Sequence, residues 1–300
     1  MKISIVTATY NRKHLLERLY HSILENSYDY DHIEWLIMDD GSTESIDDMV
    51  EEWKSNVNFP IFLFHQKNKG KMAAINSLIP RTTGDVIIEM DDDDYFVSSV
   101  FSDIVLEHKK IMDDENIYGV IYEKKLTKNN RKIPASFSKK VYRLYDLHYK
   151  KNADFDMALT FKGDYRRLFS YELEHEEKFI TEARMYYKMD QGMKGFLICD
   201  DSIMICEYQE DGYTKGIEKL FKKNPYGYYA FFREVFSYSQ KGILFSKRLY
   251  NLKHFILFGY LTKKKFFEMV RIPRGINRVL FLLLYLPGRL VSKRKFGEVS

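Results

Sequence analysis

Four consecutive aspartates, Asp91 to Asp94, follow a short apolar run that is long enough for a buried strand. Runs of like charge repel one another and are common in solvated loops. Their position after a strand favours another interpretation, because open α/β sheets bind ligands at the carboxyl ends of their strands. Mg²⁺ and Mn²⁺ prefer carboxylate oxygens and often join a protein to a diphosphate. The sequence therefore predicts that Asp91 and Asp93 clamp a divalent cation.

The aspartates come at the end of a repeated strand-and-helix pattern. Strand-like runs alternate with segments whose apolar residues recur at helical spacing. The strands are expected at Ile3–Val6, Ile33–Met38, Ile61–Phe64 and 86–90, and the helices around Leu15–Leu24, Ile46–Trp53 and Met72–Leu78. Short links between them predict an α/β fold with a mostly parallel, doubly wound sheet.

Right-handed crossovers would bring the polar ends of these four strands to one edge of the sheet. The residues expected there are Thr7, Thr9, Asp40, Lys71, Asp91 and Asp93. No Gly-x-Gly-x-x-Gly follows the first strand, and no Walker lysine motif is present. Dinucleotide cofactors and P-loop chemistry therefore receive no support.

Beyond residue 98 the pattern is looser. It predicts a helix at Val100–Met112, a strand at Tyr118–Tyr122 and a polar loop over Lys124–Lys140. It then predicts a strand at Ala158–Phe161 that ends in a turn at Gly163-Asp164, a helix with Met185 and Met189, and a pair of strands within Phe196–Cys206.

Composition and length are those of a globular protein. The 300 residues are 45% hydrophobic and 30% charged, enough for one large domain with an appendage. Cys199 and Cys206 form neither a metal pattern nor a disulfide framework, which fits a reducing cytoplasm. We expect no signal peptide at the start, and no apolar stretch reaches the roughly 20 residues of a spanning helix.

The charged residues are distributed unevenly along the chain. Residues 213–300 hold 19 Lys and Arg against 4 Asp and Glu, whereas residues 1–212 hold 28 against 39. We therefore predict an α/β domain over residues 1–212 and a basic, aromatic-rich helical region over residues 213–300.

Three motifs, each after a predicted strand, resemble glycosyltransferase family 2, which has the GT-A fold. They are Ser4–Arg12, Met38–Thr43, and Thr83–Asp85 leading into Met90–Asp94. An isolated Asp-Asp-Gly-Ser is more often a plain turn. Together, in order and over roughly residues 1–210, the motifs resemble the family closely.

The resemblance implies a donor site for a nucleotide-sugar. Thr7, Thr9, Asn11 and Arg12 match the first loop, which cradles the nucleoside. Asp40 matches the carboxylate that binds the uracil of a UDP-sugar, and Lys71 a basic position near the donor. Asp91 and Asp93 match the ends of the family's Asp-x-Asp, which holds Mn²⁺ or Mg²⁺ on the diphosphate. Asp92 stands between them, where a small or neutral residue is common, so which acids ligate the cation stays open.

Glu182 is the candidate catalytic base. In the family a Glu-Asp pair opening a helix takes the proton of the acceptor hydroxyl, and here Glu182 is followed by Ala183. The alternative is an acid favoured only by the helix dipole. Asp164 either faces the acceptor or caps a turn.

In the second half, three motifs resemble a bacterial subgroup of the family: Gly163-Asp164, Lys178–Ala183 and Ile205–Gly212. The usual acceptors of this subgroup are lipid-linked glycans assembled at the inner leaflet. The resemblance thus implies metal-dependent, inverting transfer of a sugar to a glycan hydroxyl in cell-surface polysaccharide synthesis. A sugar-phosphate nucleotidyltransferase and a non-catalytic scaffold that binds a glycan or partner are the alternatives.

The apolar run Val279–Leu286 in the basic region has arginines and lysines on both sides. It is too short to cross a bilayer and suits a helix lying in an anionic membrane surface. Packing on the catalytic domain or on a second subunit of a homodimer is the alternative. Nucleic-acid binding is disfavoured, because no recognised module is present and the body is acidic. We expect a cytoplasmic protein, peripheral on the inner face of the cell membrane.

Overall fold

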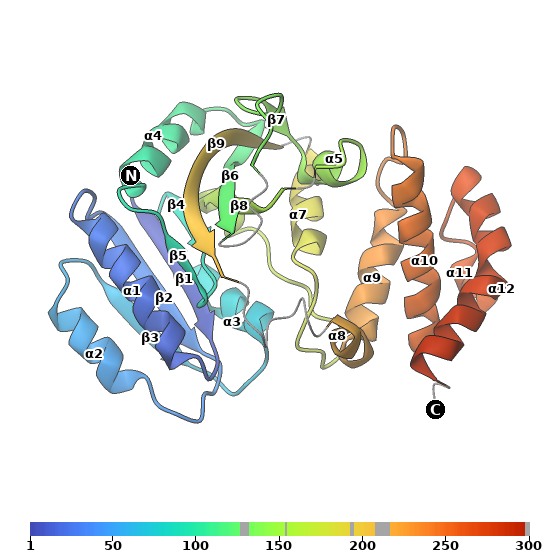
Figure 1. Cartoon of the computed structure of the whole chain (residues 1–300), viewed down its shortest axis with the longest axis horizontal. Helices are drawn as coiled ribbons and strands as arrows, with labels where there is room; N and C mark the ends of the chain where they lie inside the picture. Colours follow the sequence, from blue (N-terminus) through green and yellow to red (C-terminus); the bar gives the residue numbers. More distant parts are fainter. Residues whose placement is uncertain (127–131, 154, 193–194, 208–216, 298–300) are drawn as a thin grey trace. The chain divides into compact units, whose positions relative to one another are not determined.

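The computed structural model describes residues 1–126, 132–153, 155–192, 195–207 and 217–297, and these form two compact units (Figure 1). The first unit comprises Met1–Leu144, Ala153–Tyr171 and Met185–Glu210. The second comprises Tyr145–Asn152, Glu172–Arg184 and Asp211–Ser300. The predicted boundary between residues 212 and 213 lies outside the described residues.

The first unit is built on one mixed sheet of nine strands, in the order β3-β2-β1-β4-β8-β6-β9-β5, with β7 paired to β9. Strands β1 to β4 are parallel, as predicted. Strand β8 runs antiparallel to both β4 and β6. The strands are β1 (Ile3–Thr9), β2 (Ile33–Asp39), β3 (Ile61–His65), β4 (Val86–Glu89), β5 (Asp94–Phe96), β6 (Ile117–Leu126), β7 (Val141–Tyr142), β8 (Met157–Lys162) and β9 (Gly195–Cys206).

Two predicted elements were wrong in detail. The expected strand pair within Phe196–Cys206 is one continuous strand, β9. Its polar middle forms no turn, because it is absorbed by shifts of register against β6. The expected loop over Lys124–Lys140 starts later, because β6 continues to Leu126.

Helices cover both faces of the sheet (Figure 1). Helices α1, α2 and α4 pack on one face around a core that includes Ile5, Trp35 and Ile88. Helix α3 packs against β1 and β2 from the other face. The helices of this unit are α1 (Lys13–Ser27), α2 (Asp47–Ser55), α3 (Lys71–Leu78), the 3₁₀ turn η1 (Ile79–Arg81), α4 (Phe101–Ile111), α6 (Gly163–Arg166) and the 3₁₀ turn η2 (Asp190–Gly192); α5 (Leu144–Tyr149) and α7 (Ala183–Met189) have residues in both units.

Apolar residues on successive helical turns explain the packing. Leu16, Leu19 and Ile23 of α1 are fully buried, as their spacing predicts. Trp53 of α2 stacks on Tyr20 with ring centroids 4.5 Å apart, and its ring also lies 5.7 Å from that of Trp35.

A buried glutamate ties the start of the sheet together. Glu34 of β2 accepts hydrogen bonds from Ser4 Oγ (2.5 Å), Thr83 N (2.7 Å) and Thr83 Oγ1 (2.8 Å), and pairs with Lys2 Nζ (2.6 Å). Gly84 follows Thr83 in the sequence, and a Cβ at this position would lie 2.6 Å from Ser4 N. The Thr-Gly-Asp sequence therefore fits this turn, because only a glycine permits such close backbone approach.

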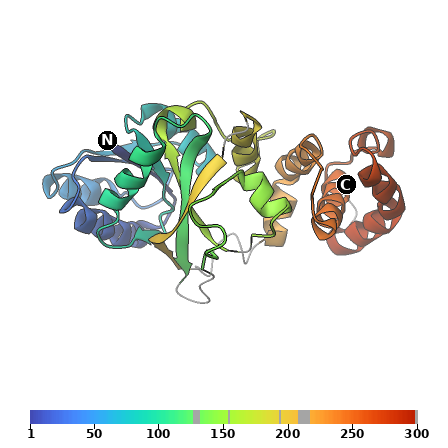
Figure 2. The same ribbon diagram turned by 90° about the horizontal axis from the view of Figure 1, so that it is seen from above.

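The second unit contains a helical bundle, drawn in orange to red in Figure 2. Helix α10 packs against both α9 and α12. In the contact between α9 and α10, the rings of Tyr229 and Phe255 stack with their centroids 5.5 Å apart. The helices are α8 (Ile217–Lys223), α9 (Pro225–Val235), α10 (Phe245–Leu261), α11 (Phe266–Met269) and α12 (Ile276–Phe296). Among the described residues, no helix combines the length and the apolar character needed to cross a membrane.

We predict that Glu34→Gln lowers the free energy of unfolding at pH 7 by about 2 kcal/mol, because charged hydrogen bonds at a buried site are weakened. Burial by itself would raise the pKa of Glu34, but Lys2 and the donors of Ser4 and Thr83 outweigh it and hold the pKa below the usual 4.5. This stabilisation is present above pH 4.5 and is lost as the pH falls through the lower folded pKa.

Urea unfolding of wild type and variant, followed from pH 7 to pH 3, measures the difference. The difference in unfolding free energy between wild type and Glu34→Gln should decrease as the pH falls. The matched control is Glu44→Gln, whose exposed pair with Lys13 should contribute less than about 0.5 kcal/mol. A difference between wild type and Glu34→Gln that stays constant with pH would contradict the prediction.

Candidate active site

The candidate site lies at the edge of the sheet where β1, β2 and β4 end. Met90 N donates to Val6 O (3.0 Å), which continues the β1–β4 pairing one residue beyond β4. The chain then turns, with Asp94 N donating to Asp91 O (3.2 Å), and enters β5. This turn carries all four aspartates. Asp91 and Asp93 are partly exposed, whereas Asp92 and Asp94 are buried.

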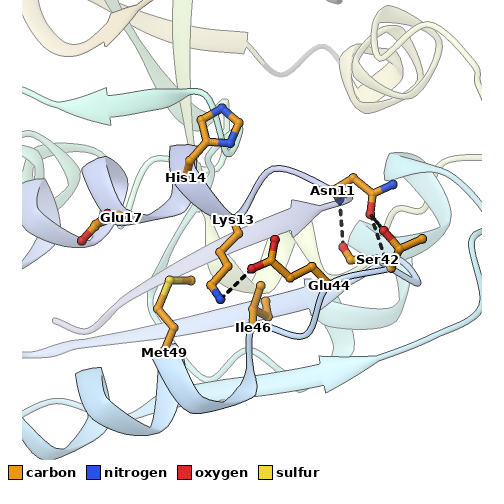
Figure 3. Close-up of a pocket in the computed structure, with 9 residues that line it drawn as sticks. Asn11, Lys13, His14, Glu17, Ser42, Glu44, Ile46 and Met49 are labelled. Carbon is orange, nitrogen blue, oxygen red and sulfur yellow. Dashed lines mark hydrogen bonds and ion pairs between the residues drawn. The ribbon is translucent and has the colours of Figure 1, made fainter.

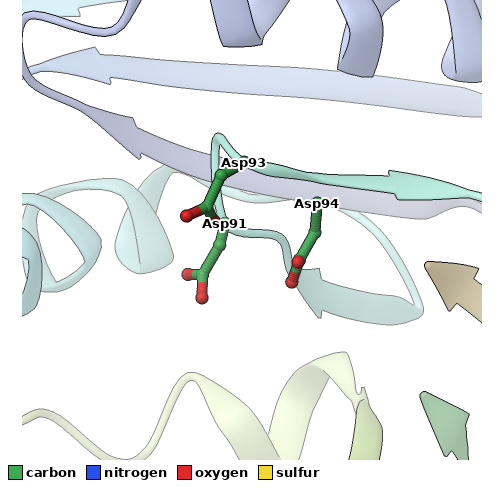
Figure 4. A group of neighbouring side chains, drawn as sticks. All are labelled: Asp91, Asp93 and Asp94. Atoms are coloured by element: carbon green, nitrogen blue, oxygen red, sulfur yellow. The ribbon is translucent and has the colours of Figure 1, made fainter. Parts of the chain in front are cut away.

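Three of these carboxylates form a cluster (Figure 4). Asp91, Asp93 and Asp94 each offer an oxygen, and the three oxygens lie within 4.8 Å of one another. Within the described structure, Asp94 Oδ1 is also buried without a hydrogen-bond partner. Three hard oxygen donors, in a cluster that also holds an unpartnered buried carboxylate oxygen, fit a Mn²⁺ or Mg²⁺ ion. The structure thus brings the predicted ligands Asp91 and Asp93 together and adds Asp94.

Asp92 has different contacts. Its carboxylate accepts a hydrogen bond from Thr9 Oγ1 (2.9 Å) and pairs with Arg12 Nη1 (3.2 Å). The same Arg12 nitrogen lies 3.2 Å from Asp93 Oδ2. Burial raises the pKa of Asp92 to about 6, although the Arg12 guanidinium opposes the shift. Asp92 therefore ties the first loop to the acidic turn.

Lys71 neutralises Asp91. It is the first residue of α3, and its Nζ lies 2.5 Å from Asp91 Oδ1. Desolvation would raise the pKa of Asp91, but Lys71, Lys124 and Arg12 together hold it below its usual value. The preceding Gly70 has φ 91°, a conformation that favours glycine and lets the chain turn into the helix.

Sequence reasoning missed two cationic residues of the site. Lys124 pairs with Asp94, and the charges of Asp94 and Asp91 outweigh burial to raise the pKa of the lysine. Arg18 donates to Asp93 O (2.7 Å), pairs with Glu207, and lies over the Tyr95 ring with its guanidinium 4.5 Å from the centroid. Neither could be found by pattern, since Lys124 stands in a run of basic residues and Arg18 on a helix surface.

Asp40 holds the loop that presents Lys71. Its Oδ1 accepts hydrogen bonds from Gln66 Nε2 (2.7 Å) and Lys69 N (2.8 Å), and its Oδ2 from Gly70 N (2.7 Å). The side chain is buried at the end of β2. These bonds give Asp40 a clear role in shaping the site, and its contact with a uracil ring stays a prediction.

The first loop is fixed by Asn11. Asn11 N donates to Ser42 Oγ (2.9 Å) and its Oδ1 accepts from Thr43 N (2.8 Å), as Figure 3 shows. Thr7 lies within β1 and not in this loop. Its buried hydroxyl accepts a hydrogen bond from Trp35 Nε1 (3.0 Å).

A pocket of about 430 Å³ opens on the α1 and α2 side of this contact (Figure 3). Its lining residues are Asn11, Lys13, His14, Glu17, Ser42, Thr43, Glu44, Ile46 and Met49. Of the residues predicted to bind the donor, it includes only Asn11.

Glu182 and Asp164 are the predicted base and the predicted acceptor residue. Glu182 belongs to the second unit and directly precedes α7, which agrees with its expected place at the start of a helix. Asp164 is on α6, where its side chain is 99% exposed and pairs with Arg167 Nη2 (2.5 Å). The roles of both residues stay predictions.

Comparison with known proteins identifies the family. The profile of Glycosyl transferase family 2 matches residues 4–173, a span that contains the first loop, the acidic turn and Lys71. The chain belongs to this family. Its mixed sheet with flanking helices is the GT-A fold.

Relatives of this family member are similar over only part of their length. An uncharacterized glycosyltransferase, alr2836 of Nostoc sp., is 28% identical over 132 residues, or 44% of this chain and 39% of that protein. The poly(ribitol-phosphate) β-N-acetylglucosaminyltransferase TarS of Staphylococcus aureus is 24% identical over 139 residues, or 46% of this chain and 23% of TarS.

Solved structures resemble nearly the whole chain. TarS residues 1–349 in complex with UDP-GlcNAc superpose with a TM-score of 0.65 at 13% identity, over 99% of this chain and 90% of that one. The mannosyltransferase PcManGT of Pyrobaculum calidifontis, in complex with GDP-Man and Mn²⁺, gives a TM-score of 0.58 at 16% identity, over 97% and 83%. At such identities the likeness shows the fold alone.

We predict that Lys71→Met binds Mn²⁺ about fivefold more tightly than wild type when no nucleotide is present. The ammonium competes for Asp91, and removing a partly exposed pair of this kind changes the binding free energy by about 1 kcal/mol. Isothermal titration with Mn²⁺ measures the change. Lys69→Met, two residues earlier, is the matched control and should bind like wild type. Equal affinity of Lys71→Met and wild type would remove Asp91 from the ligand set.

Proposed function

We propose that this chain transfers a sugar from a nucleotide-sugar, preferentially a UDP-sugar, to a hydroxyl group of a glycan or lipid-linked glycan in cell-surface polysaccharide synthesis. The observation that carries the proposal is the cluster of Asp91, Asp93 and Asp94 at the carboxyl edge of a family 2 sheet. The donors named for the structural neighbours, UDP-GlcNAc and GDP-Man, support a nucleotide-sugar.

A divalent cation would be held by the three clustered aspartates. When bound, such an ion offsets the negative charge that grows on the departing nucleoside diphosphate. Lys71 would then leave Asp91 and donate to the diphosphate. Arg12 and Thr9 hold the Asp92 carboxylate by an ion pair and a hydrogen bond, and Arg12 also contacts Asp93, which would help to fix the turn that presents the ligands.

Glu182 would act as the general base. An acceptor hydroxyl has a pKa far above 7, so a positioned carboxylate must take its proton as attack on the anomeric carbon begins. The bond to the diphosphate breaks as the new glycosidic bond forms, which inverts the anomeric centre. No covalent intermediate is required.

The same proposal places the protein in the cytoplasm, peripheral on the inner face of the membrane, where lipid-linked acceptors are found. Family membership argues against a sugar-phosphate nucleotidyltransferase. Retention of all four acids, with cations paired to each, argues against a scaffold that has lost its catalysis.

We predict that UDP with Mn²⁺ raises the melting temperature of the wild-type protein by several degrees, more than GDP, CDP or TDP, and that EDTA abolishes the shift. At 100 times its Kd a ligand stabilises the folded state by about 2.7 kcal/mol. Asp93→Asn should lose most of the Mn²⁺-dependent part, whereas Asp113→Asn, an exposed control on another loop, should keep it. If no nucleotide produced a shift, the scaffold alternative would be the better explanation.

We further predict that Glu182→Gln lowers kcat by about 100- to 10,000-fold with little change in donor affinity, as expected for loss of a general base. Sugar transfer to an acceptor, or slow hydrolysis of the UDP-sugar, measures kcat. UDP titration measures donor binding. Glu176→Gln, an exposed acid on the same segment, is the control. Equal loss of turnover and donor affinity in Glu182→Gln would indicate a structural role instead.

A further inference from the structure

Helix α12 has an apolar face that points outward. Its exposed apolar residues Ile276, Val279, Leu283, Leu286 and Leu290 follow one another at intervals of three and four, so they form one stripe along the helix. Leu283 and Leu286, at the centre of this α12 stripe, are 68% and 70% exposed.

The opposite face of α12 is the one that packs in the bundle. Phe281 is fully buried, and its ring lies 6.0 Å from that of Phe255 on α10. Asn277 is also buried and accepts a hydrogen bond from Arg248 Nη1 (3.1 Å). Gly288 permits close contact with α10, because a Cβ there would lie 2.9 Å from Ile256 Cγ2. The packing of the bundle therefore does not account for the α12 stripe.

The surroundings of the α12 stripe are strongly basic. Residues 245–297 contain 13 Lys and Arg, and Glu268 is their only acidic residue. Exposed Arg274 and Arg278 stand near the start of α12, and exposed Lys293, Arg294 and Lys295 near its end. Glu218 of α8 pairs with Lys295 (2.6 Å), so one acid stands at the end of α12 among these basic residues. An apolar stripe with an excess of positive charge at both ends complements a surface that is apolar inside and anionic outside.

We propose that α12 lies in the plane of an anionic membrane surface, with the α12 stripe among the lipid chains and its basic ends at the phosphates. A second copy of the chain would bring the same basic residues against one another, and like charges oppose such pairing. Spanning the bilayer does not fit, because α12 is not apolar enough. This inference deepens the membrane location in the proposed function but does not depend on the transfer reaction.

A single tryptophan can report which face meets lipid. Both native tryptophans, Trp35 and Trp53, are buried in the first unit. We expect the fluorescence of Leu286→Trp to be quenched by vesicles that contain brominated lipid together with about 30% phosphatidylglycerol. Leu106→Trp, at an exposed leucine on α4, is the control and should not be quenched. Absence of quenching in Leu286→Trp on vesicles that bind the protein would overturn the proposal.

Sedimentation with the same vesicles tests the energetics. Wild type should bind vesicles with phosphatidylglycerol and not those of phosphatidylcholine alone, and about 0.5 M salt should weaken the binding. Leu283→Glu/Leu286→Glu should reduce the bound fraction at least about tenfold, because two carboxylates enter the apolar region. The exposed control Leu106→Glu should bind like wild type. Arg274→Gln/Arg294→Gln should bind less tightly, with a weaker dependence on salt.

The other outcomes contradict the proposal. If the double glutamate variant bound as well as wild type, the contact would be electrostatic and the α12 stripe would stay in water. If wild type ignored vesicles but formed a dimer that this variant dissociated, measured by light scattering, the α12 stripe would be a subunit interface. If wild type neither bound vesicles nor dimerised, the α12 stripe would be neither a membrane-binding surface nor a subunit interface. The nucleotide-dependent melting shift of the variant should equal that of wild type in every case, which separates failure here from failure of the proposed function.

Discussion

Compensation of negative charge at the end of β4 is the constraint on which the site depends. Four adjacent carboxylates, two of them buried, would repel one another if nothing faced them. Arg12, Lys71 and Lys124 come from three different parts of the chain and pair with all four. Arg12 directly precedes α1, Lys71 begins α3 and Lys124 lies on β6, so all four charges are paired only when these three segments have come together. The charge balance thus links the fold to the site.

The same balance defines what a donor complex must change. Asp92 and Asp94 are buried with their cations, so exchange of these pairs would expose a charge inside the protein at high cost. Asp91 and Asp93 are partly open to solvent, and Lys71 ends in a flexible ammonium. In the proposed donor complex, a divalent ion would therefore displace a lysine only at Asp91, on the open side of the turn. Asp94 would keep Lys124 on Oδ2 and offer Oδ1, which has no hydrogen-bond partner among the described residues.

The sequence predicted the first half of the sheet well because each strand there ends in a recognisable polar motif and is followed by a helix of regular period. Asp91 and Asp93 could be placed because strand order and the right-handed crossover determine where strand ends meet. The cationic partners of these acids could not be predicted in the same way. Lys124 reaches Asp94 because β9 pairs with β6 on one side and with β5, which Asp94 begins, on the other, and no local pattern encodes these pairings. The same limit applies to β9, where the polar centre suggested a turn but a change of register keeps the strand continuous.

The charge difference along the chain has a different physical meaning in each unit. In the first unit the site acids are paired to cations from the same unit. In the second, Glu172, Glu174 and Glu234 all pair with Arg184, and Glu268 accepts from the backbone at the start of α11. Glu218 pairs with Lys295 of α12, and the acids of the second unit therefore neutralise only some of the basic residues along α10 to α12. This surplus of positive charge attracts anions in any environment, and salt screens it in solution. At a lipid surface the phosphates supply the counter-charge at the depth where α12 presents its exposed leucines, so the electrostatic and apolar contributions act on the same face of one helix.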